Sequence, residues 1–190
     1  MGSSYLLLAL IWISYYGLHS LFAADSLKKW ASDSVILKRF YRLGYTVFST
    51  LGLIIIWRYS ELNSGLPLFE IGIRPIWLGL LLISLLFMYF AFKPYSTAEF
   101  LGLDTIKNPN LFNQPGQLST KGLNKWVRHP LYVGSAFAIV AYVFLNAHAN
   151  RILYCSISLA YLWLGSKLEE RKLIRRYGKT YSDYLEKTPF

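Results

Sequence analysis

The residues best suited to chemistry stand at two boundaries between apolar and basic sequence. Two adjacent carboxylates, Glu169 and Glu170, follow an apolar run at the first boundary. An ionisable side chain at a membrane boundary is costly unless a partner or a ligand faces it. The basic residues that follow the two carboxylates do not lie at the i,i+4 spacing that would pair them on a helix. We therefore expect a ligand or an interhelix partner for at least one of these carboxylates.

The second boundary is the tripeptide Arg128-His129-Pro130, which precedes another apolar run. Pro130 fits the first turn of a helix, where its missing N–H costs nothing. The start of a helix exposes backbone N–H donors and a partial positive charge, which suit a carboxylate or another anion. The alternative is an ordinary Arg–His pair at a membrane boundary. Gly134, on the first turn of the same predicted helix, permits the close approach of a helix or a ligand.

The remaining candidate residues give weaker indications. His19 lies within an apolar run, where a functional role and an interhelix hydrogen bond explain it equally well. His148 is expected in an external loop. With one cysteine, Cys155, and three scattered histidines, the sequence shows no metal-ligand spacing, so we expect no metal site. It also has no glycine-rich nucleotide-binding motif.

Composition indicates that a membrane protein positions these residues. Hydrophobic residues make up 54% of the 190 residues and charged residues 16%, against about 45–50% and about 25% in soluble domains. A helix needs about 20 mostly apolar residues to cross a bilayer. We expect a single all-α membrane domain, residues 1–190, with five transmembrane helices. Their expected bounds are 5–24, 41–59, 76–92, 131–149 and 152–168.

The basic residues predict how these helices cross the membrane. Five of the 20 Lys and Arg fall between or beside the first two runs, five between the third and fourth, and seven from Lys167 at the end of the fifth run onward, which places 17 on one side. The positive-inside rule assigns that side to the cytoplasm and the N-terminus to the outside. The net charge of +10 is then a topology and lipid-surface signal and requires no nucleic acid. We expect a multi-pass protein of a prokaryotic cytoplasmic membrane, with its site facing the cytosol.

Two cytoplasmic segments, 93–127 and 167–190, are longer than connecting helices requires, and long loops are often functional. Both lie on one face, so they could build one site there. The tail is predicted to continue the fifth helix, to break at Gly178 and to end at Pro189. An amphipathic helix on anionic lipid is an alternative role that does not exclude catalysis.

These motifs, taken in order, resemble those of the isoprenylcysteine carboxyl methyltransferase family. The resemblance rests on the run GLNKWVRHPLYVG from Gly122 to Gly134, on Glu169-Glu170, and on the pattern of Tyr177-Gly178, Tyr181 and Tyr184. It covers about residues 116–188, while the first three apolar runs match only in kind. Related branches of the superfamily methylate phospholipid amines and small thiols.

The resemblance implies an integral-membrane methyltransferase that uses S-adenosylmethionine. A carboxylate such as Glu169 suits the cationic sulfonium and ammonium of that cofactor, and the helix start at His129 suits its carboxylate. Arg128 and Glu170 remain catalytic candidates without an assigned step. The residues that the resemblance assigns to cofactor binding are Gln117, Leu118, Ser119, His129, Pro130, Leu131, Tyr132 and Glu169.

Two departures bear on the methyl acceptor. Asn124 stands where the family often has tyrosine, and Gly165 stands where the prenylcysteine enzymes have an arginine that meets the substrate carboxylate. The main expectation is a lipophilic acceptor that enters between helices, because each buried CH₂ contributes roughly 0.8 kcal/mol. The alternatives are a small-thiol methyltransferase and a non-catalytic membrane scaffold, while the lack of an inverted repeat argues against a transporter. The sequence leaves the oligomeric state open.

Overall fold

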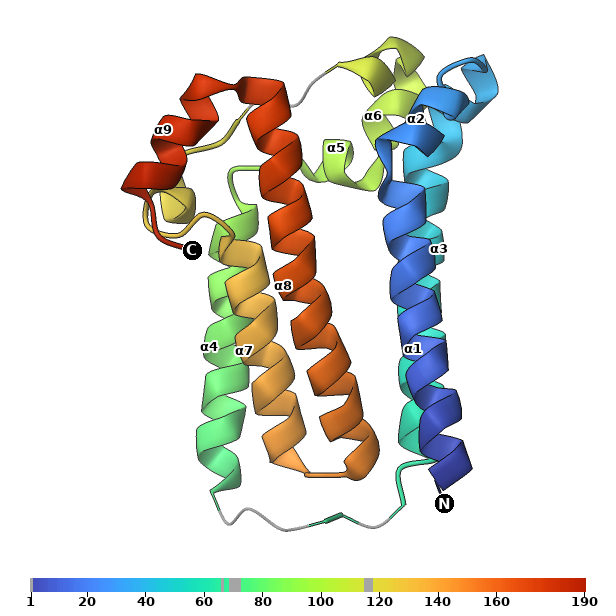
Figure 1. Cartoon of the computed structure of the whole chain (residues 1–190), viewed down its shortest axis with the longest axis vertical. Coiled ribbons are helices and arrows are strands. Elements are labelled where there is room, and N and C mark those ends of the chain that lie inside the picture. The colour runs from blue at the N-terminus through green and yellow to red at the C-terminus, as the bar shows by residue number, and fades with distance from the viewer. Residues whose placement is uncertain (1, 66, 69–72, 115–117) are drawn as a thin grey trace. The chain divides into compact units, whose positions relative to one another are not determined.

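Every secondary-structure element in the described part of the chain is a helix, as the composition predicts. The structure is a computed structural model, and it describes residues 2–65, 67–68, 73–114 and 118–190. The chain forms two compact units (Figure 1). The first unit contains α1 (Gly2–Ala23), α2 (Asp25–Ala31), α3 (Val35–Leu62), α5 (Thr97–Leu101), α6 (Leu103–Lys107) and the 3-10 helix η1 (Pro109–Asn113). The second contains α4 (Arg74–Phe92), the 3-10 helix η2 (Gly122–Lys125), α7 (Pro130–Leu145), α8 (Ala149–Tyr177) and α9 (Lys179–Lys187).

Three of these helices are long and apolar enough to cross a membrane, namely α1 (from Ser4), α3 and α4. The fourth expected span corresponds to α7, a shorter apolar helix of 16 residues. The fifth expected span is the first part of α8, where tyrosines and serines interrupt the apolar residues. The five-span topology with its inside and outside assignment therefore stays a prediction.

The turn between α7 and α8 lies earlier than expected. The sequence places the hairpin at Asn150-Arg151, whereas α7 ends at Leu145 and α8 begins at Ala149. The backbone of Asn146 is extended, with φ −153° and ψ 103°, and this ends α7. Arg151 then stabilises the turn, because its guanidinium donates to the Asn146 carbonyl at 3.2 Å.

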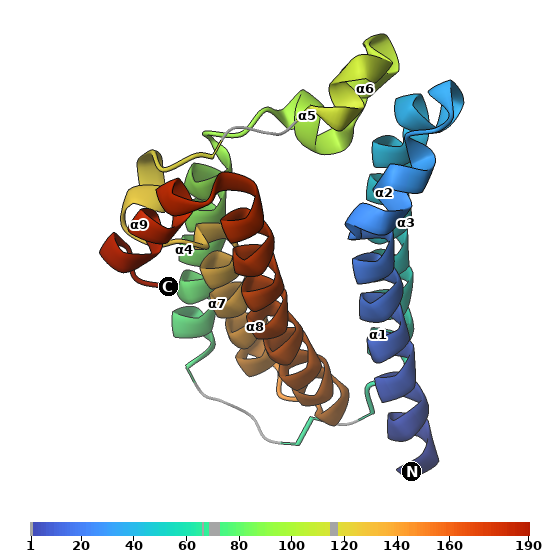
Figure 2. The ribbon, with the colours of Figure 1, turned by 45° about the horizontal axis from the view of Figure 1, so that its top comes forward.

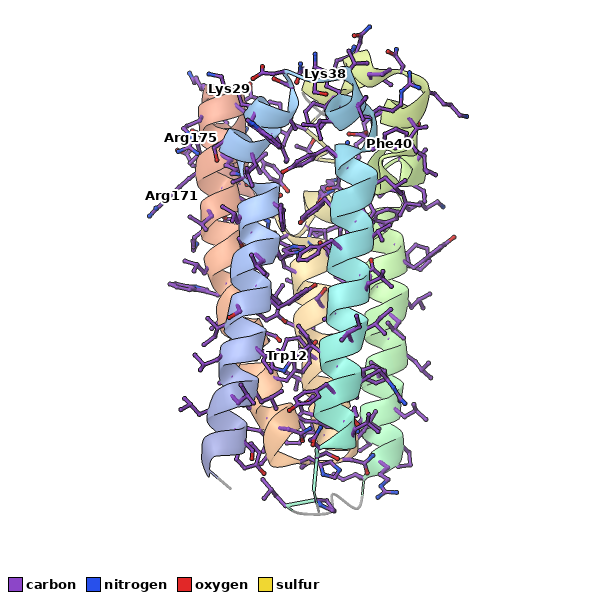
Figure 3. All side chains as sticks on the ribbon, turned by 90° about the vertical axis from the view of Figure 1, so that its right-hand side faces the viewer. Trp12, Lys29, Lys38, Phe40, Arg171 and Arg175 are labelled. Carbon is purple, nitrogen blue, oxygen red and sulfur yellow. The ribbon has the colours of Figure 1, made fainter. Side chains whose placement is uncertain are left out.

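Polar side chains join α1 to α3 in the first unit. The hydroxyl of Tyr15 donates to the Ser49 carbonyl at 2.8 Å. His19 forms hydrogen bonds with Tyr45 through Nε2 at 2.9 Å and with the Ser49 hydroxyl through Nδ1 at 3.0 Å. Trp12 is fully buried and stacks on the ring of a neighbouring tyrosine (Figure 3). The interhelix hydrogen bond, one of the two explanations open for His19, is the one observed.

The short helices after α4 pack on the start of α3. Gly102 lies so close that a Cβ there would be 2.7 Å from the Leu43 backbone nitrogen, and its φ of +77° also favours glycine. Thr105 donates to the carbonyl of Arg39 at 3.1 Å. The long segment 93–127, which was expected to build one site together with the tail, is divided between the two units. Its part 95–116 belongs to the first unit, and its later part to the second.

In the second unit, α4, α7 and α8 run side by side (Figures 1 and 2). At Gly134 of α7, an added Cβ would lie 2.5 Å from Met88 Cγ of α4, so the glycine permits the close helix approach that the sequence predicts. The expected break of the tail also occurs. Gly178, with φ +55°, separates α8 from α9, and α9 ends at Lys187, shortly before Pro189.

Candidate cofactor-binding site

A cluster of charged side chains connects the start of α7 to the C-terminal part of α8, within the second unit. Its centre is Glu170, which is 8% exposed. One carboxylate oxygen lies 3.3 Å from Arg128 Nη1 and 3.3 Å from His129 Nε2, and the other lies 3.4 Å from Lys167 Nζ. A buried carboxylate is tolerated when opposite charges and hydrogen bonds surround it. Glu170 therefore has the interhelix partners that the sequence predicts for at least one of the two carboxylates.

One of these partners was not anticipated from the sequence. Lys167 precedes Glu170 by three residues on α8, so the two side chains share a helix face. Sequence reasoning considered only the bases that follow the carboxylates and concluded that helical pairing explains them poorly. For Glu170 this conclusion is wrong, because the pairing runs toward the N-terminus of the helix.

His129 occupies the N-cap position of α7 and is 6% exposed. Its ring stacks on Tyr132, with ring centroids 5.4 Å apart and planes inclined by 12°. Its Nδ1 lies 3.7 Å from Glu169 Oε2, while its Nε2 faces Glu170. Because Pro130 sets the first helical residue, the imidazole is held between the helix start and both carboxylates.

Glu169 differs from its neighbour in exposure and in contacts. Its side chain is 44% exposed, against 11% for Glu170. Its described contact is the 3.7 Å approach to His129, which is longer than a hydrogen bond. Glu169 therefore presents a carboxylate with acceptor capacity at the edge of the cluster. This environment suits a cationic ligand group, whereas that of Glu170 suits a structural ion pair.

Sequence reasoning missed Tyr181 as a site residue. Tyr181 lies on α9, is 1% exposed, and has a hydroxyl without a hydrogen-bond partner among the described residues. Burial, followed by the negative charges of Glu170 and Glu169, raises the pKa of Tyr181 to about 12. Its phenol thus keeps its proton at neutral pH and can donate a hydrogen bond. It lies close enough to both carboxylates for their charges to raise its pKa. The signal available in the sequence was its place in the tyrosine pattern on which the resemblance rests, but no role in the site was assigned to it.

The tail returns over the start of α7. The backbone N–H of Arg128 donates to the Pro189 carbonyl at 3.0 Å. The ring of Phe190 lies 5.4 Å from that of His129 and 5.7 Å from Lys167 Nζ. These contacts explain why His129 is nearly inaccessible while Glu169 is not.

The segment before the cluster contains Gln117, Leu118 and Ser119, which were expected to bind the cofactor, and Asn124, which was not. Asn124, at the family's tyrosine position, is buried and joins η2 to α9, because its carbonyl accepts from the Tyr184 hydroxyl at 2.5 Å. Its amide donates to Ser119 at 3.5 Å. Leu118 is described without a polar contact of its own, and Gln117 lies outside the described residues. The structure thus brings His129, Tyr132 and Glu169 together, with Pro130 and Leu131 on the same helix start.

The described side chains fit the chemistry of S-adenosylmethionine. Glu169 offers a carboxylate for a cationic group, and the start of α7 offers donors for an anionic one. Two buried polar groups, the Tyr181 hydroxyl and the Arg128 Nε–H, have no partner among the described residues. Buried polar groups are nearly always hydrogen-bonded, so these two are candidates for contact with a bound molecule.

The described part of the chain is all-α, with apolar helices long enough to cross a membrane and a buried charged cluster where α7 begins. The chain belongs to the NnrU family, because the model for the NnrU protein family matches residues 6–188.

The chain is also similar to several proteins named methanethiol S-methyltransferase. The chain is 27% identical over 175 residues to methanethiol S-methyltransferase 1 of Bradyrhizobium diazoefficiens, covering 89% of this chain and 60% of that protein. It is 24% identical over 193 residues to methanethiol S-methyltransferase of Crocosphaera subtropica, covering 90% and 68%. It is 38% identical over 64 residues to the protein of the same name from a Pseudomonas species, covering 34% and 24%. No solved structure matches the chain. The resemblance to the membrane methyltransferases that the sequence indicates is thereby confirmed.

Proposed function

We propose that this protein is an integral-membrane methyltransferase that transfers a methyl group from S-adenosylmethionine to a small thiol. The observation that carries the proposal is the similarity, over about nine-tenths of the chain, to proteins named methanethiol S-methyltransferase. The chain spans 60% of the length of one of them, so the activity and the acceptor are both inferences for this chain.

The described residues support this proposal through their positions around His129. Glu169 holds the cationic part of the cofactor, and the backbone donors at the start of α7 hold its carboxylate. Tyr181 donates a hydrogen bond from a neutral phenol, since its pKa is raised to about 12. Glu170 is a positioning residue, because it fixes Arg128 and His129 without being exposed itself.

When bound, the cofactor supplies a methyl group on a cationic sulfur, which a thiolate accepts by displacement. The protein contributes mainly alignment and the exclusion of water, which together account for much of the rate of such reactions. A thiolate acceptor needs no base during the transfer itself, because it is already deprotonated.

A small thiol is better supported than the lipophilic acceptor that the sequence favoured. The relatives are named for a small thiol. In addition, a Cβ at Gly165 would lie 3.9 Å from the Tyr132 hydroxyl, so this position faces the site but carries no cation for a substrate carboxylate. The absence of that cation removes one contact that a prenylcysteine acceptor would use.

The test uses the purified full chain with methyl-labelled S-adenosylmethionine and a series of thiols of increasing chain length, with a prenylated cysteine included. We expect the highest activity with methanethiol and a steady decline with chain length. Glu169→Gln should abolish most of the labelling, and Glu186→Gln, an exposed carboxylate on α9, should not. Preference for the prenylated acceptor would restore the lipophilic alternative. Absence of both transfer and cofactor binding in the folded protein would refute the proposal.

A further inference from the structure

A pocket separate from the His129 cluster opens where α4 ends. It has a volume of about 450 Å³, within the size range of ligand pockets. Residues from the end of α4 form one side and residues of η2 and its C-cap form the other. The lining residues are Phe90, Lys93, Pro94, Gly122, Leu123 and Trp126.

The position of this pocket along α4 is informative. α4 is long and apolar enough to cross a membrane and ends at Phe92, so Lys93 is the first residue after the apolar segment. Tryptophan and lysine are typical of the headgroup level of a bilayer. The pocket therefore lies at the depth of lipid headgroups, with Phe90 on its membrane side.

The lining chemistry is that of an amphiphile site. Four lining side chains are apolar or aromatic, one is a lysine, and no carboxylate is among them. Trp126 is 69% exposed, and Lys125 Nζ lies 5.8 Å from the centre of its ring, which adds a second cation near the opening. A large exposed aromatic surface with two cations complements a molecule that joins a negative group to a hydrocarbon chain.

We propose that this pocket binds an anionic membrane phospholipid. Its phosphate is held by Lys93 and Lys125, and the first part of an acyl chain lies against Phe90, Leu123 and Trp126. Gly122 lines the pocket without a side chain, and its φ of +61° favours glycine. None of these residues belongs to the cluster around His129, so the proposal is independent of the methyl-transfer activity.

The test reconstitutes the full chain in phosphatidylcholine vesicles that contain a small fraction of phosphatidylglycerol with a photoreactive group near its glycerol. Cross-linked peptides are then located by mass spectrometry. We expect cross-links in 90–94 and 122–126 that fall about fivefold in Lys93→Gln, the loss expected for one juxtamembrane lysine. Lys93→Arg should retain them. Lys179→Gln removes an exposed lysine of α9 outside the pocket and should leave them unchanged.

Two further measurements decide the ligand class. A photoreactive phosphatidylcholine should label these peptides less than the anionic probe, and equal labelling would refute recognition of charge. Excess glycerol phosphate in the buffer should not displace the lipid, because glycerol phosphate has no acyl chain to contact the apolar part of the pocket. Full displacement would assign the pocket to a water-soluble phosphate and overturn the proposal. Leu123→Ser tests the contact between the acyl chain and the apolar part of the pocket. Unchanged labelling of this variant by the anionic probe would also contradict the proposal.

Discussion

At the scale of single residues, Glu169 and Glu170 are neighbours in sequence with opposite environments. Glu170 contacts three basic side chains, whereas Glu169 is half exposed and contacts His129 alone among the described residues. Removing a buried carboxylate leaves its partners uncompensated, whereas a half-exposed carboxylate near the start of a helix is available to a ligand. The two substitutions should therefore have separable effects.

Glu169→Ala is expected to weaken S-adenosylmethionine binding by about 1–3 kcal/mol, the scale of a charge-assisted hydrogen bond, and to leave thermal unfolding nearly unchanged. Glu170→Ala should lower the free energy of unfolding by about 3–5 kcal/mol, because Arg128, His129 and Lys167 lose their common partner. Calorimetric binding and thermal unfolding in the same detergent measure both. If Glu169→Ala unfolds the protein and Glu170→Ala does not, the two roles are reversed.

Tyr181 offers a second test, because its hydroxyl is buried without a described partner. Removing such a group costs no hydrogen bond within the protein, so Tyr181→Phe should leave the free energy of unfolding at neutral pH unchanged or slightly higher. If the phenol donates to the cofactor, affinity should fall by about 0.5–1.5 kcal/mol. A clear loss of stability in Tyr181→Phe would instead show an internal partner.

The raised pKa of Tyr181 also predicts an alkaline effect. Burial and the nearby carboxylates favour the neutral phenol in the folded state, moving its pKa from 10.0 to about 12. As the pH rises, the unfolded chain loses the phenol proton before the folded protein does. The stability that the raised pKa contributes is therefore fully present below pH 10 and is lost as the pH rises toward 12. Unfolding measured from pH 9 to 11.5 should decline less steeply in Tyr181→Phe than in the parent. Identical slopes would contradict the assignment.

The sequence predicted the residues of the site better than their partners. His129 at a helix start and the two carboxylates were recognisable, because boundary polarity and a proline after the cap are local features. The contacts of Arg128 with Pro189 and of Tyr181 with the charged cluster depend on the direction in which α9 returns after Gly178. That direction follows from long-range packing, which residue spacing does not contain.

At the scale of elements, the packing of α4 against α7 depends on Gly134. A Cβ there would lie 2.5 Å from Met88 Cγ and 3.2 Å from Phe87 Cδ1, both closer than side chains normally approach. The long apolar helices were predictable from apolar length. The short helices α2, α5 and α6 were not, because no apolar run marks them. The α7–α8 turn was also misplaced, because an uncharged run gives no local sign of where the helix ends before Asn146.

Gly134→Ala is expected to lower the free energy of unfolding by about 1–3 kcal/mol, the usual cost of overpacking. Gly79→Ala is a matched control on α4, because a Cβ there meets nothing within 4 Å, and it should be neutral or stabilising. Combining Gly134→Ala with Met88→Ala should recover part of the loss, since the closest atom is removed. Thermal unfolding of the parent and the three variants measures this. Equal effects of Gly134→Ala and Gly79→Ala would show that α4 and α7 have room to separate.

At the scale of the whole molecule, the basic residues and the helix lengths bear on the number of membrane crossings. Lys29 and Lys38 lie at one end of the first unit, and Arg171 and Arg175 lie in the half of α8 away from the α7 turn (Figure 3). These four labelled residues follow the grouping of basic residues on which the predicted topology rests. The length of α7 argues against a simple crossing. Its 16 residues rise about 24 Å, whereas the hydrocarbon core is about 30 Å thick.

A short helix can still cross if the bilayer thins or the flanking residues extend the span, each at modest cost. We therefore expect α7 and α8 to cross as a pair, which places Asn146 outside and Lys121 inside. Both residues are exposed, so each can be replaced by cysteine in a Cys155→Ser background and labelled with a membrane-impermeant maleimide. Asn146→Cys should react in intact cells, and Lys121→Cys should react only after permeabilisation. If both react only after permeabilisation, the α7–α8 hairpin does not cross, three spans remain, and the hairpin with the cluster around His129 lies at the cytosolic face.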